Sequence, residues 1–308
     1  MKWLLFFGLL IGSVLKPGNN TVLKRYVIRG TAQGTSFQLI YYGTDSMVTK
    51  ASIDSLFASI DSSLSIYKPY SLVSQFNASS RGVLADKHLK KIIEEAQEAN
   101  RATKGVFDIT ILPLTEEWGF AAKTVVGVPN RYKIKNLLKC VGSDKIFWKG
   151  DSLIKKLACT RLDPNGIAQG YSADLMAEIV EAKGIQNYLA EIGGEMRVKG
   201  KKESNQPFLI SIEKAGASNW DMDDQPRQLA VADGAITSSG NYRKFIQSNG
   251  RQVSHIIDAR SGLTIQNELI SVTVFAKDAI TADAYDNSFM AMGLQKSLAF
   301  CKKHQPVS

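Results

Sequence analysis

The alternation of hydrophobic and polar positions along the chain predicts a series of β-strands. The first two apolar-rich runs are 24–30 and 35–42, and a turn with two glycines separates them. Runs of the same kind recur in the second half of the chain, at 186–192, 196–200, 207–212, 229–232, 253–258 and 269–276. Each run is short enough to be a single strand of a sheet.

Hydrophobic residues at helical spacing predict helices among these strands. They mark one face over 53–64, a second helix spans 87–103, and a third follows Gly170 and ends at Gly184. Helices and strands alternate without a repeating strand–helix–strand rhythm. The sequence therefore predicts an α+β fold with mixed sheets and packed helices.

The N-terminus has the layout of a bacterial export signal. Met1 and Lys2 form a short basic region, and the apolar run 3–15 follows it. This run is short for a membrane span, and a buried core helix is the alternative interpretation. We expect residues 1–20 to be an export signal or membrane anchor and residues 21–308 to form the folded domain. The protein would then be periplasmic or anchored to the outer face of the bacterial inner membrane.

Charge and cysteine content narrow the choice of partners. The net charge is +9, but the lysines are spread along the chain without an arginine-rich arm, so we expect no nucleic-acid partner.

Cys140, Cys159 and Cys301 are widely spaced, with no Cys-x-x-Cys pair and no nearby histidine. This spacing argues against a disulfide framework or a zinc site, and we expect three ordinary buried residues.

The segment 281–287 carries side chains that suit a metal ion. Asp283 and Asn287 are four residues apart on what the pattern indicates is the first turn of a helix, so their oxygens project from one face. With Asp286 beside them, they offer the hard oxygen ligands that Mg²⁺ prefers, and they leave room for phosphates. The alternative is a helical turn whose acids only complement the helix dipole.

Four further features are candidates for ligand contacts. Asp108 lies just past a helix end in an apolar stretch, where a buried carboxylate needs donors from backbone amides or from a ligand. The glycine-containing loop 163–171 opens a helix and exposes backbone amides to an anion such as phosphate. Tyr67 follows a helix on a turn, and His255 lies in an apolar strand. A hinge aromatic and a core histidine are the alternatives for these two residues.

Eight short motifs, taken in order, resemble those of one known family. They are Gly34-Thr35, Ser65-x-Tyr67-x-Pro-x-Ser71, Gly105-x-Phe-Asp-Ile-Thr110, Gly166-Ile-Ala-x-Gly-Tyr171, Ile192-Gly-Gly-Glu195, Thr237-Ser-Ser-Gly-Asn-Tyr242, Ser254-His-Ile-Ile-Asp258 and Ala282-Asp-Ala284. The chain resembles the ApbE family, the FAD:protein FMN transferases, from about Arg25 to its C-terminus. The family normally continues into another strand after Lys303, so we expect a domain without its last strand.

The resemblance implies an exported enzyme that binds FAD in a cleft between two α/β subdomains. Mg²⁺ would lie on the pyrophosphate of FAD, and the FMN half would be transferred to a Ser or Thr hydroxyl of an acceptor flavoprotein, with release of AMP. Two alternatives use the same cleft. One is a metal-dependent pyrophosphatase that splits FAD into FMN and AMP, and the other is a flavin-binding protein without catalytic activity.

The resemblance also implies a set of metal ligands. They would be the backbone carbonyl of Ala168 and the side chains of Asp283 and Asn287, with Asp286 adjacent. The family usually has Thr at the Asn287 position, and Asn also offers a neutral oxygen. Many relatives have Lys where this chain has Gln169, so one positive charge near the phosphates would be missing.

The remaining implied roles concern the FAD pocket and the reaction centre. The pocket residues would be Gln33, Tyr67, Val106, Phe107, Asp108, Asn165, Tyr171 and Ile257. Among them, Tyr67 would flank the isoalloxazine ring and Asp108 would hydrogen-bond the nucleotide. His255 would help to deprotonate the acceptor hydroxyl, because an unperturbed imidazole titrates near neutrality, and Asp283 could share that role.

Overall fold

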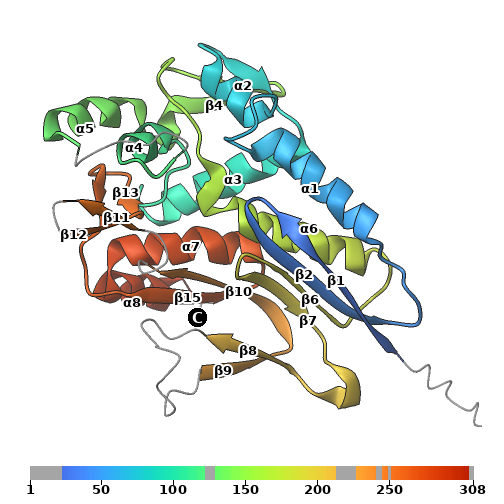
Figure 1. Ribbon diagram of the computed structural model, residues 1–308. Helices are drawn as coiled ribbons and strands as arrows, with labels where there is room; N and C mark the ends of the chain where they lie inside the picture. Colours follow the sequence, from blue (N-terminus) through green and yellow to red (C-terminus); the bar gives the residue numbers. More distant parts are fainter. Residues whose placement is uncertain (1–22, 122–128, 213–226, 241–244, 249–250, 305–308) are drawn as a thin grey trace, which may run out of the picture.

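The computed structural model describes residues 23–121, 129–212, 227–240, 245–248 and 251–304 (Figure 1). The predicted export signal, residues 1–20, lies outside these ranges. Among the helices within them, none combines the length and the hydrophobicity that crossing a bilayer requires.

A six-stranded antiparallel sheet forms the centre of the fold, in the order β1-β2-β6-β7-β10-β15. Its strands are β1 (Lys24–Ala32), β2 (Thr35–Gly43), β6 (Tyr188–Ile192), β7 (Glu195–Lys199), β10 (Asp233–Gly240) and β15 (Ser271–Ala276). The β1–β2 hairpin turns on Gln33 and Gly34, whose φ angles are both positive (52° and 78°). Such a two-residue turn matches the twist of the strands it joins.

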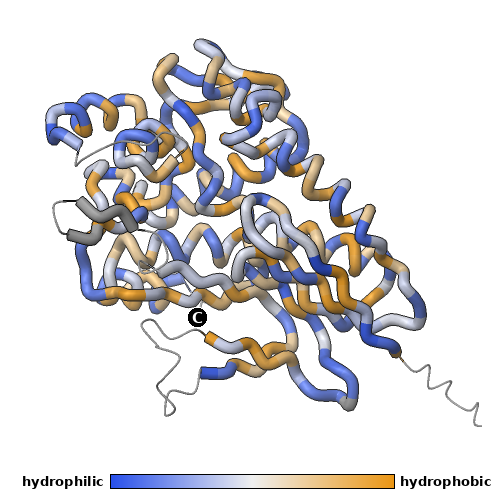
Figure 2. Tube along the Cα trace, in the orientation of Figure 1, coloured by the Kyte–Doolittle hydropathy of each residue, from blue (hydrophilic) through white to orange (hydrophobic). Residues whose placement is uncertain are grey.

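Helices cover one face of this sheet (Figure 1). Those that build this layer are α1 (Lys50–Leu64), α3 (Lys87–Ala102), α6 (Ala168–Glu181) and α7 (Ala279–Met292). Figure 2 shows hydrophobic and hydrophilic positions alternating along the helices, as expected where one side packs and the other meets solvent. In α3 the buried stripe includes Leu89, Ile92, Ile93 and Ala96, the residues whose spacing predicted the helix.

The hairpin of β8 (Phe208–Ile212) and β9 (Arg227–Val231) covers the opposite face. Phe208 and Ile210 pack there against Tyr42 and Val198 of the main sheet. Tyr41 belongs instead to the core beneath the helices, because successive side chains of a strand point to opposite faces.

A smaller lobe lies beside one end of the helix layer (Figure 1). It consists of α4 (Leu112–Glu117), α5 (Arg131–Leu137), β11 (Phe245–Ser248), β12 (Arg251–Ser254), β13 (Ile257–Asp258) and β14 (Leu263–Thr264). Leu114, Trp118, Ile134 and Ile257 form its small hydrophobic core. The Trp118 indole also donates to the Gly262 carbonyl (2.8 Å) and so ties α4 to the β13–β14 hairpin.

The remaining elements extend the helix layer. They are α2 (Leu72–Ala78), the antiparallel sheet of β3 (Gly82–Leu84), β5 (Ser152–Lys155) and β4 (Ile146–Lys149), and α8 (Leu294–Lys303), with short 3-10 helices at 138–140, 143–145, 164–166 and 203–205. α8 packs on α7, where the Phe289 and Phe300 rings lie 5.4 Å apart.

The predicted α+β fold is confirmed, but several strands were missed, namely β3, β4, β5, β10, β11 and β14. β10 was not predicted, because its run Thr237-Ser-Ser-Gly240 is polar and contacts α7 partly through hydrogen bonds. The strand predicted at 253–258 is interrupted between β12 and β13. There the Ser254 hydroxyl accepts from the Ile256 backbone N–H (3.2 Å), a local bond that competes with strand pairing.

The prediction of three ordinary buried cysteines is wrong, because two are paired and the third is only partly buried. Cys140 and Cys159 form a disulfide with an S–S distance of 2.09 Å, and only Cys301 is a free thiol. The β4–β5 hairpin lies between the two cysteines and folds back on itself, which brings their Cα atoms to 5.4 Å. That distance suits a disulfide, and a separation of 19 residues could not reveal it without the hairpin.

Candidate active site

A cavity of about 430 Å³ opens between the α6–α7 layer and the smaller lobe. A volume of this size is typical of sites for small molecules and cofactors. All but two of the residues assigned to the site from the sequence line it, namely Gln33, Tyr67, Val106, Phe107, Asp108, Asn165, Ala168, His255, Ile257, Asp283 and Asn287. The exceptions are Tyr171 and Asp286. The fold thus brings together residues that are far apart in the sequence.

The first turns of α6 and α7 cross at the bottom of the cavity. Gly170 allows the crossing, since a Cβ at this position would lie 2.2 Å from the Ala279 carbonyl oxygen and 2.7 Å from the Asp283 Cβ. The Gly170 backbone N–H donates to Asp283 Oδ2 at 2.8 Å. This close approach places the Asp283 carboxylate beside the N-terminus of α6, where Ala168 also lines the cavity.

Asn287 lies one helical turn after Asp283 on the same face, as the spacing predicted. Its Nδ2 donates to the Asp283 carbonyl (3.1 Å), while its Oδ1 lies 3.1 Å from Ser239 Oγ of β10. The same hydroxyl lies 3.0 Å from Asp286 Oδ1, so one serine holds both side chains. Asp286 therefore points toward the sheet and not into the cavity.

The two aspartates are buried without a counter-charge. Asp283 is 3% exposed and Asp286 is 1% exposed. Among the residues that the structure describes, neither forms an ion pair with a lysine or arginine. Burial, and then the charge of Asp286, raises the pKa of Asp283 well above its usual value. Burial likewise raises the pKa of Asp286, and the nearby Glu195 adds to the effect.

These residues fit a divalent cation. A carboxylate, an amide oxygen and a backbone carbonyl are the hard ligands that Mg²⁺ takes, and a cation would neutralise the buried negative charge. Within the described part of the chain, no group of three or more His, Cys, Asp or Glu has the arrangement of a metal site. The predicted ligand set would not form such a group, because only Asp283 among its three ligands is of these types.

The Asp108 carboxylate obtains its donors from the protein. Its Oδ1 accepts from the Thr110 backbone N–H (2.8 Å) and hydroxyl (2.6 Å), and its Oδ2 accepts from Asn100 Nδ2 (2.9 Å) and the Ser143 N–H (2.7 Å). Four donors fill the lone-pair positions of a carboxylate. Asp108 therefore shapes the cavity floor, and the predicted hydrogen bond to a nucleotide has no free acceptor position in this arrangement.

The rim of the cavity carries an exposed aromatic ring. Tyr67 is 60% exposed, and Asn165 Nδ2 lies 3.5 Å from its hydroxyl. Burial of the hydroxyl, followed by the charge of Asp163, raises the pKa of Tyr67. An exposed ring at the rim is accessible to a planar ligand, and the role of Tyr67 against the flavin stays a prediction.

The assignment of Tyr171 to the pocket is not supported by its position. Tyr171 is 6% exposed, and its hydroxyl lies 2.9 Å from Nδ1 of the buried His88 in α3. Burial raises the pKa of Tyr171 to about 12. Its side chain therefore joins α6 to α3 and does not line the cavity.

His255 lies at the junction of the cavity and the smaller lobe. Its ring stands edge-on to Phe120, with the ring centroids 6.3 Å apart. The side chain lines the cavity and is only partly buried, so the alternative of a core histidine is wrong. Its role in proton transfer stays a prediction.

The N-terminus of α6 faces the cavity. Its cap residue, Ile167, provides no side-chain acceptor, and Ala168 and Gln169 line the cavity. The Gly170 N–H is bound to Asp283 Oδ2, and the N–H groups before it, with the positive end of the helix dipole, favour an anion at this point. No role was predicted for Ser239, which belongs to the motif Thr237-Ser-Ser-Gly-Asn-Tyr242. Its polar side chain in a strand was the signal that could have identified it.

Comparisons with known proteins agree with this geometry. The ApbE family matches residues 33–308. FAD:protein FMN transferase from Vibrio cholerae is 30% identical over 99% of this chain and 91% of its own length, and the protein of that name from Haemophilus influenzae is 30% identical over 90% and 83%. Among solved structures, the flavin transferase ApbE from Vibrio cholerae superposes with a TM-score of 0.81 (29% identity, 92% of each chain). The apo form of the Pseudomonas stutzeri flavinyl transferase ApbE superposes with a TM-score of 0.83 (27% identity, 93% and 90%).

The fold, the cavity and these relatives define an enzyme of the flavin transferase type. The chain belongs to the ApbE family. The family and fold that the sequence motifs predicted are therefore confirmed.

Proposed function

We propose that this enzyme transfers FMN from FAD to a Ser or Thr hydroxyl of an acceptor protein, in a reaction that depends on Mg²⁺. The observation that carries the proposal is the junction of α6 and α7. There the N-terminus of α6, which has no acceptor from its own cap residue, and the buried Asp283, which forms no ion pair among the described residues, border one cavity. A site of this kind suits a pyrophosphate with a bound cation. FAD is the pyrophosphate substrate that the names of the relatives specify for those proteins.

The ligands of the cation would be Asp283, Asn287 and the Ala168 carbonyl. When bound, Mg²⁺ supplies neutralisation of the charge that develops on the pyrophosphate oxygens. The chain's own residues position the substrate. The N–H groups at the start of α6 bind phosphate oxygens, and Tyr67 covers one face of the flavin at the rim. Gln169 is neutral, so the positive potential that the protein provides at the phosphates comes from the dipole of α6.

In the reaction, the acceptor oxygen forms a bond to the FMN phosphorus, the pyrophosphate P–O bond breaks, and AMP leaves. The proton of the acceptor hydroxyl passes to a base at the cavity. His255 is the candidate base because it lines the same cavity as the oxygen ligands of α7. Phosphoryl transfer of this kind depends mainly on positioning and charge neutralisation.

We also propose that the enzyme acts outside the cytoplasm. Its N-terminal segment has the pattern of an export signal. The Cys140–Cys159 disulfide supports the same compartment, because disulfides persist in the periplasm and are rare in the cytosol of mesophiles. The acceptor would then be an exported flavoprotein, reached in the periplasm or at the outer face of the inner membrane.

The proposal is tested by intact-mass analysis of a candidate acceptor with a Ser/Thr flavinylation motif after incubation with the enzyme, FAD and Mg²⁺. We expect the acceptor to gain the mass of one FMN unit, and a chelator or Asp283→Ala to abolish the gain. Asp151→Ala is a matched control. Asp151 is an exposed carboxylate that pairs with Lys90, and neither residue lines the cavity. It should leave transfer unchanged.

Two other outcomes would overturn the proposal in different ways. Free FMN and AMP with every tested acceptor unmodified would identify a pyrophosphatase that uses water. Intact FAD, bound equally with and without Mg²⁺, would identify a flavin-binding protein without catalytic activity. Control reactions without acceptor, analysed for FMN and AMP, distinguish the two.

A further inference from the structure

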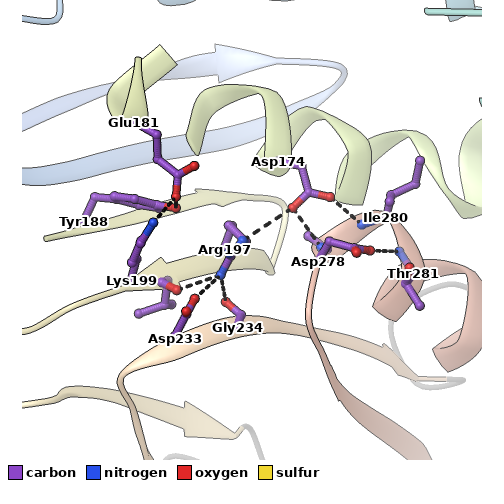
Figure 3. A network of polar contacts seen from close by, with 12 residues as sticks. Asp174, Glu181, Tyr188, Arg197, Lys199, Asp233, Gly234, Asp278, Ile280 and Thr281 are labelled. Atoms are coloured by element: carbon purple, nitrogen blue, oxygen red, sulfur yellow. Dashed lines mark hydrogen bonds and ion pairs between the residues drawn. The ribbon is translucent and has the colours of Figure 1, made fainter. Parts of the chain in front are cut away.

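α6 and α7 cap each other's N-termini. The Gly170 N–H of α6 donates to the Asp283 carboxylate of α7 (2.8 Å). In return, the Ala279 and Ile280 N–H groups of α7 donate to the two oxygens of Asp174 in α6, at 2.9 and 2.8 Å (Figure 3). Asp174 lies one turn after Gly170, so both contacts come from one face of α6.

Asp174 satisfies N–H groups that α7 cannot satisfy by itself. The N-cap residue of α7, Asp278, accepts from the Thr281 N–H (3.1 Å). The first two N–H groups of the helix, those of Ala279 and Ile280, have no acceptor within their own helix. Because the two oxygens of Asp174 bind these successive N–H groups, they fix the rotation of α7 about its axis as well as its position along that axis.

The sheet in turn holds Asp174 in place (Figure 3). Arg197 of β7 places its Nε 4.0 Å from Asp174 Oδ1. Its Nη1 donates to the Asp233 carboxylate and to the Gly234 carbonyl of β10, each at 2.9 Å. The Asp174 side chain is 14% exposed, so this ion pair is largely protected from solvent. The cap is therefore anchored to β7 and β10 and does not move freely with α6.

The far end of α6 is tied to the same sheet. Glu181, in the last turn of α6, accepts from the Tyr188 hydroxyl of β6 (2.7 Å) and from Lys199 Nζ of β7 (2.9 Å). α6 is thus a fixed element at both ends. The reciprocal caps join the first turns of α6 and α7, and Ser239 of β10 holds the Asp286 and Asn287 side chains further along α7.

We propose that Asp174 is a positioning residue for the cation site, an inference that rests on the proposed function. Asp174 holds α7 in the register that directs the Asp283 carboxylate and the Asn287 amide toward the Ala168 carbonyl of α6. Asp174 touches neither the cation nor the substrate. Loss of the cap would let α7 shift or rotate and would spread the three oxygen ligands apart.

The inference is tested by measuring Mn²⁺ affinity of the purified, FAD-loaded protein by electron paramagnetic resonance. Residues that orient metal ligands typically contribute 10–100-fold to metal affinity, so we expect Asp174→Asn to weaken Mn²⁺ binding by about that factor. FMN transfer should fall at low Mg²⁺ and recover at saturating Mg²⁺. Asp174→Glu, which keeps a carboxylate, should bind Mn²⁺ more tightly than Asp174→Asn.

The matched control is Asp86→Asn. Asp86 caps α3 by accepting from the Leu89 N–H (2.8 Å), and α3 carries none of the proposed ligands. This variant should lower the melting temperature without changing Mn²⁺ affinity. If Asp174→Asn does not fold, Asp174→Glu and Asp86→Glu provide the same comparison.

Unchanged Mn²⁺ affinity in a folded Asp174→Asn protein with a lowered melting temperature would overturn the inference, since Asp174 would then be structural only. The proposed function fails separately. A wild-type protein that binds no Mn²⁺ would contradict the cation site itself, whatever the variants do.

Discussion

At the scale of single residues, Lys155 is a charged group that is buried away from the cavity. It is 5% exposed, and no hydrogen-bond acceptor for its ammonium lies among the described residues. The ammonium lies 4.3 Å from the centroid of the Phe76 ring, a contact that offsets part of the cost of burial. Burial, and then the charge of Arg161, lowers the pKa of Lys155 to about 8.

Lys155→Met is therefore expected to stabilise the protein at neutral pH. Replacing buried charges by apolar side chains of similar size often stabilises by 1–4 kcal/mol, and because methionine gives up the cation–π attraction to Phe76 we expect about 1 kcal/mol here. The pKa is lower in the folded state than the unfolded value of 10.5, so the wild-type protein gains stability as the pH rises from about 8 to about 10.5. Urea unfolding at pH 7 and pH 10 should show the advantage of the variant shrinking at the higher pH. A variant less stable than wild type at pH 7 would contradict this account.

The site residues differ in how far the sequence could place them. The four-residue spacing of Asp283 and Asn287 was enough to predict that both side chains lie on one face of a helix, because helix geometry fixes that relation. The environment of Asp108 could be predicted only as a need for donors. Two donors are local, at Thr110, but the other two come from Ser143, 35 residues away, and from Asn100 of the neighbouring helix, and no local pattern identifies these two. Tyr171 was misplaced because the sequence does not give the rotation of α6 relative to the cavity.

At the scale of elements, the disulfide supports the floor of the cavity. Cys140 ends a short helix, and the next residues, Gly142 and Ser143, donate their N–H groups to Thr110 Oγ1 and to Asp108 Oδ2, each at 2.7 Å. The disulfide joins this segment to the chain that leaves β5.

Removing the disulfide should destabilise the protein and loosen this floor. Closing a loop of about this length contributes about 3 kcal/mol, so we expect Cys140→Ser/Cys159→Ser to lower the free energy of unfolding by about that amount. FAD should also bind more weakly, as measured by fluorescence titration. Cys301→Ser is the matched control, since Cys301 is a partly buried thiol outside the disulfide. Equal stability of the double variant and this control would contradict the prediction.

Helices and strands could be predicted where buried residues recur at a regular spacing along the chain. α3 alternates a buried stripe with charged residues, and β2 alternates along the sheet, so both were found with nearly correct ends. β10 was missed because its contacts with α7 are partly polar. The short helices α2 and α4 have too few turns for a period to be visible.

At the scale of the whole molecule, the cavity could not have been predicted from elements alone. Its lining comes from the β1–β2 turn, α1, the smaller lobe, α6, β10 and α7. Hydrophobic periodicity gives the elements and not their spatial order. The order of eight motifs supplied that information through family resemblance, which implies a known arrangement. The sequence was thus sufficient to infer the fold class. The arrangement of the cavity could be inferred only through the family resemblance.

The molecule as a whole should respond to pH and to metal in a coupled way. The pKa values of Asp283 and Asp286 are raised in the folded state, so these groups favour folding at low pH, and that stability is lost as the pH rises from about 4 through the raised values. A cation binds the ionised carboxylates and reverses the loss, and its affinity therefore rises with pH. We expect Mg²⁺ to raise the melting temperature of the FAD-loaded protein more at pH 8 than at pH 6, as measured by calorimetry. Asp283→Asn should remove most of the Mg²⁺ effect and flatten the pH dependence without metal. An equal Mg²⁺ effect at both pH values would show that the buried carboxylates are not its binding site.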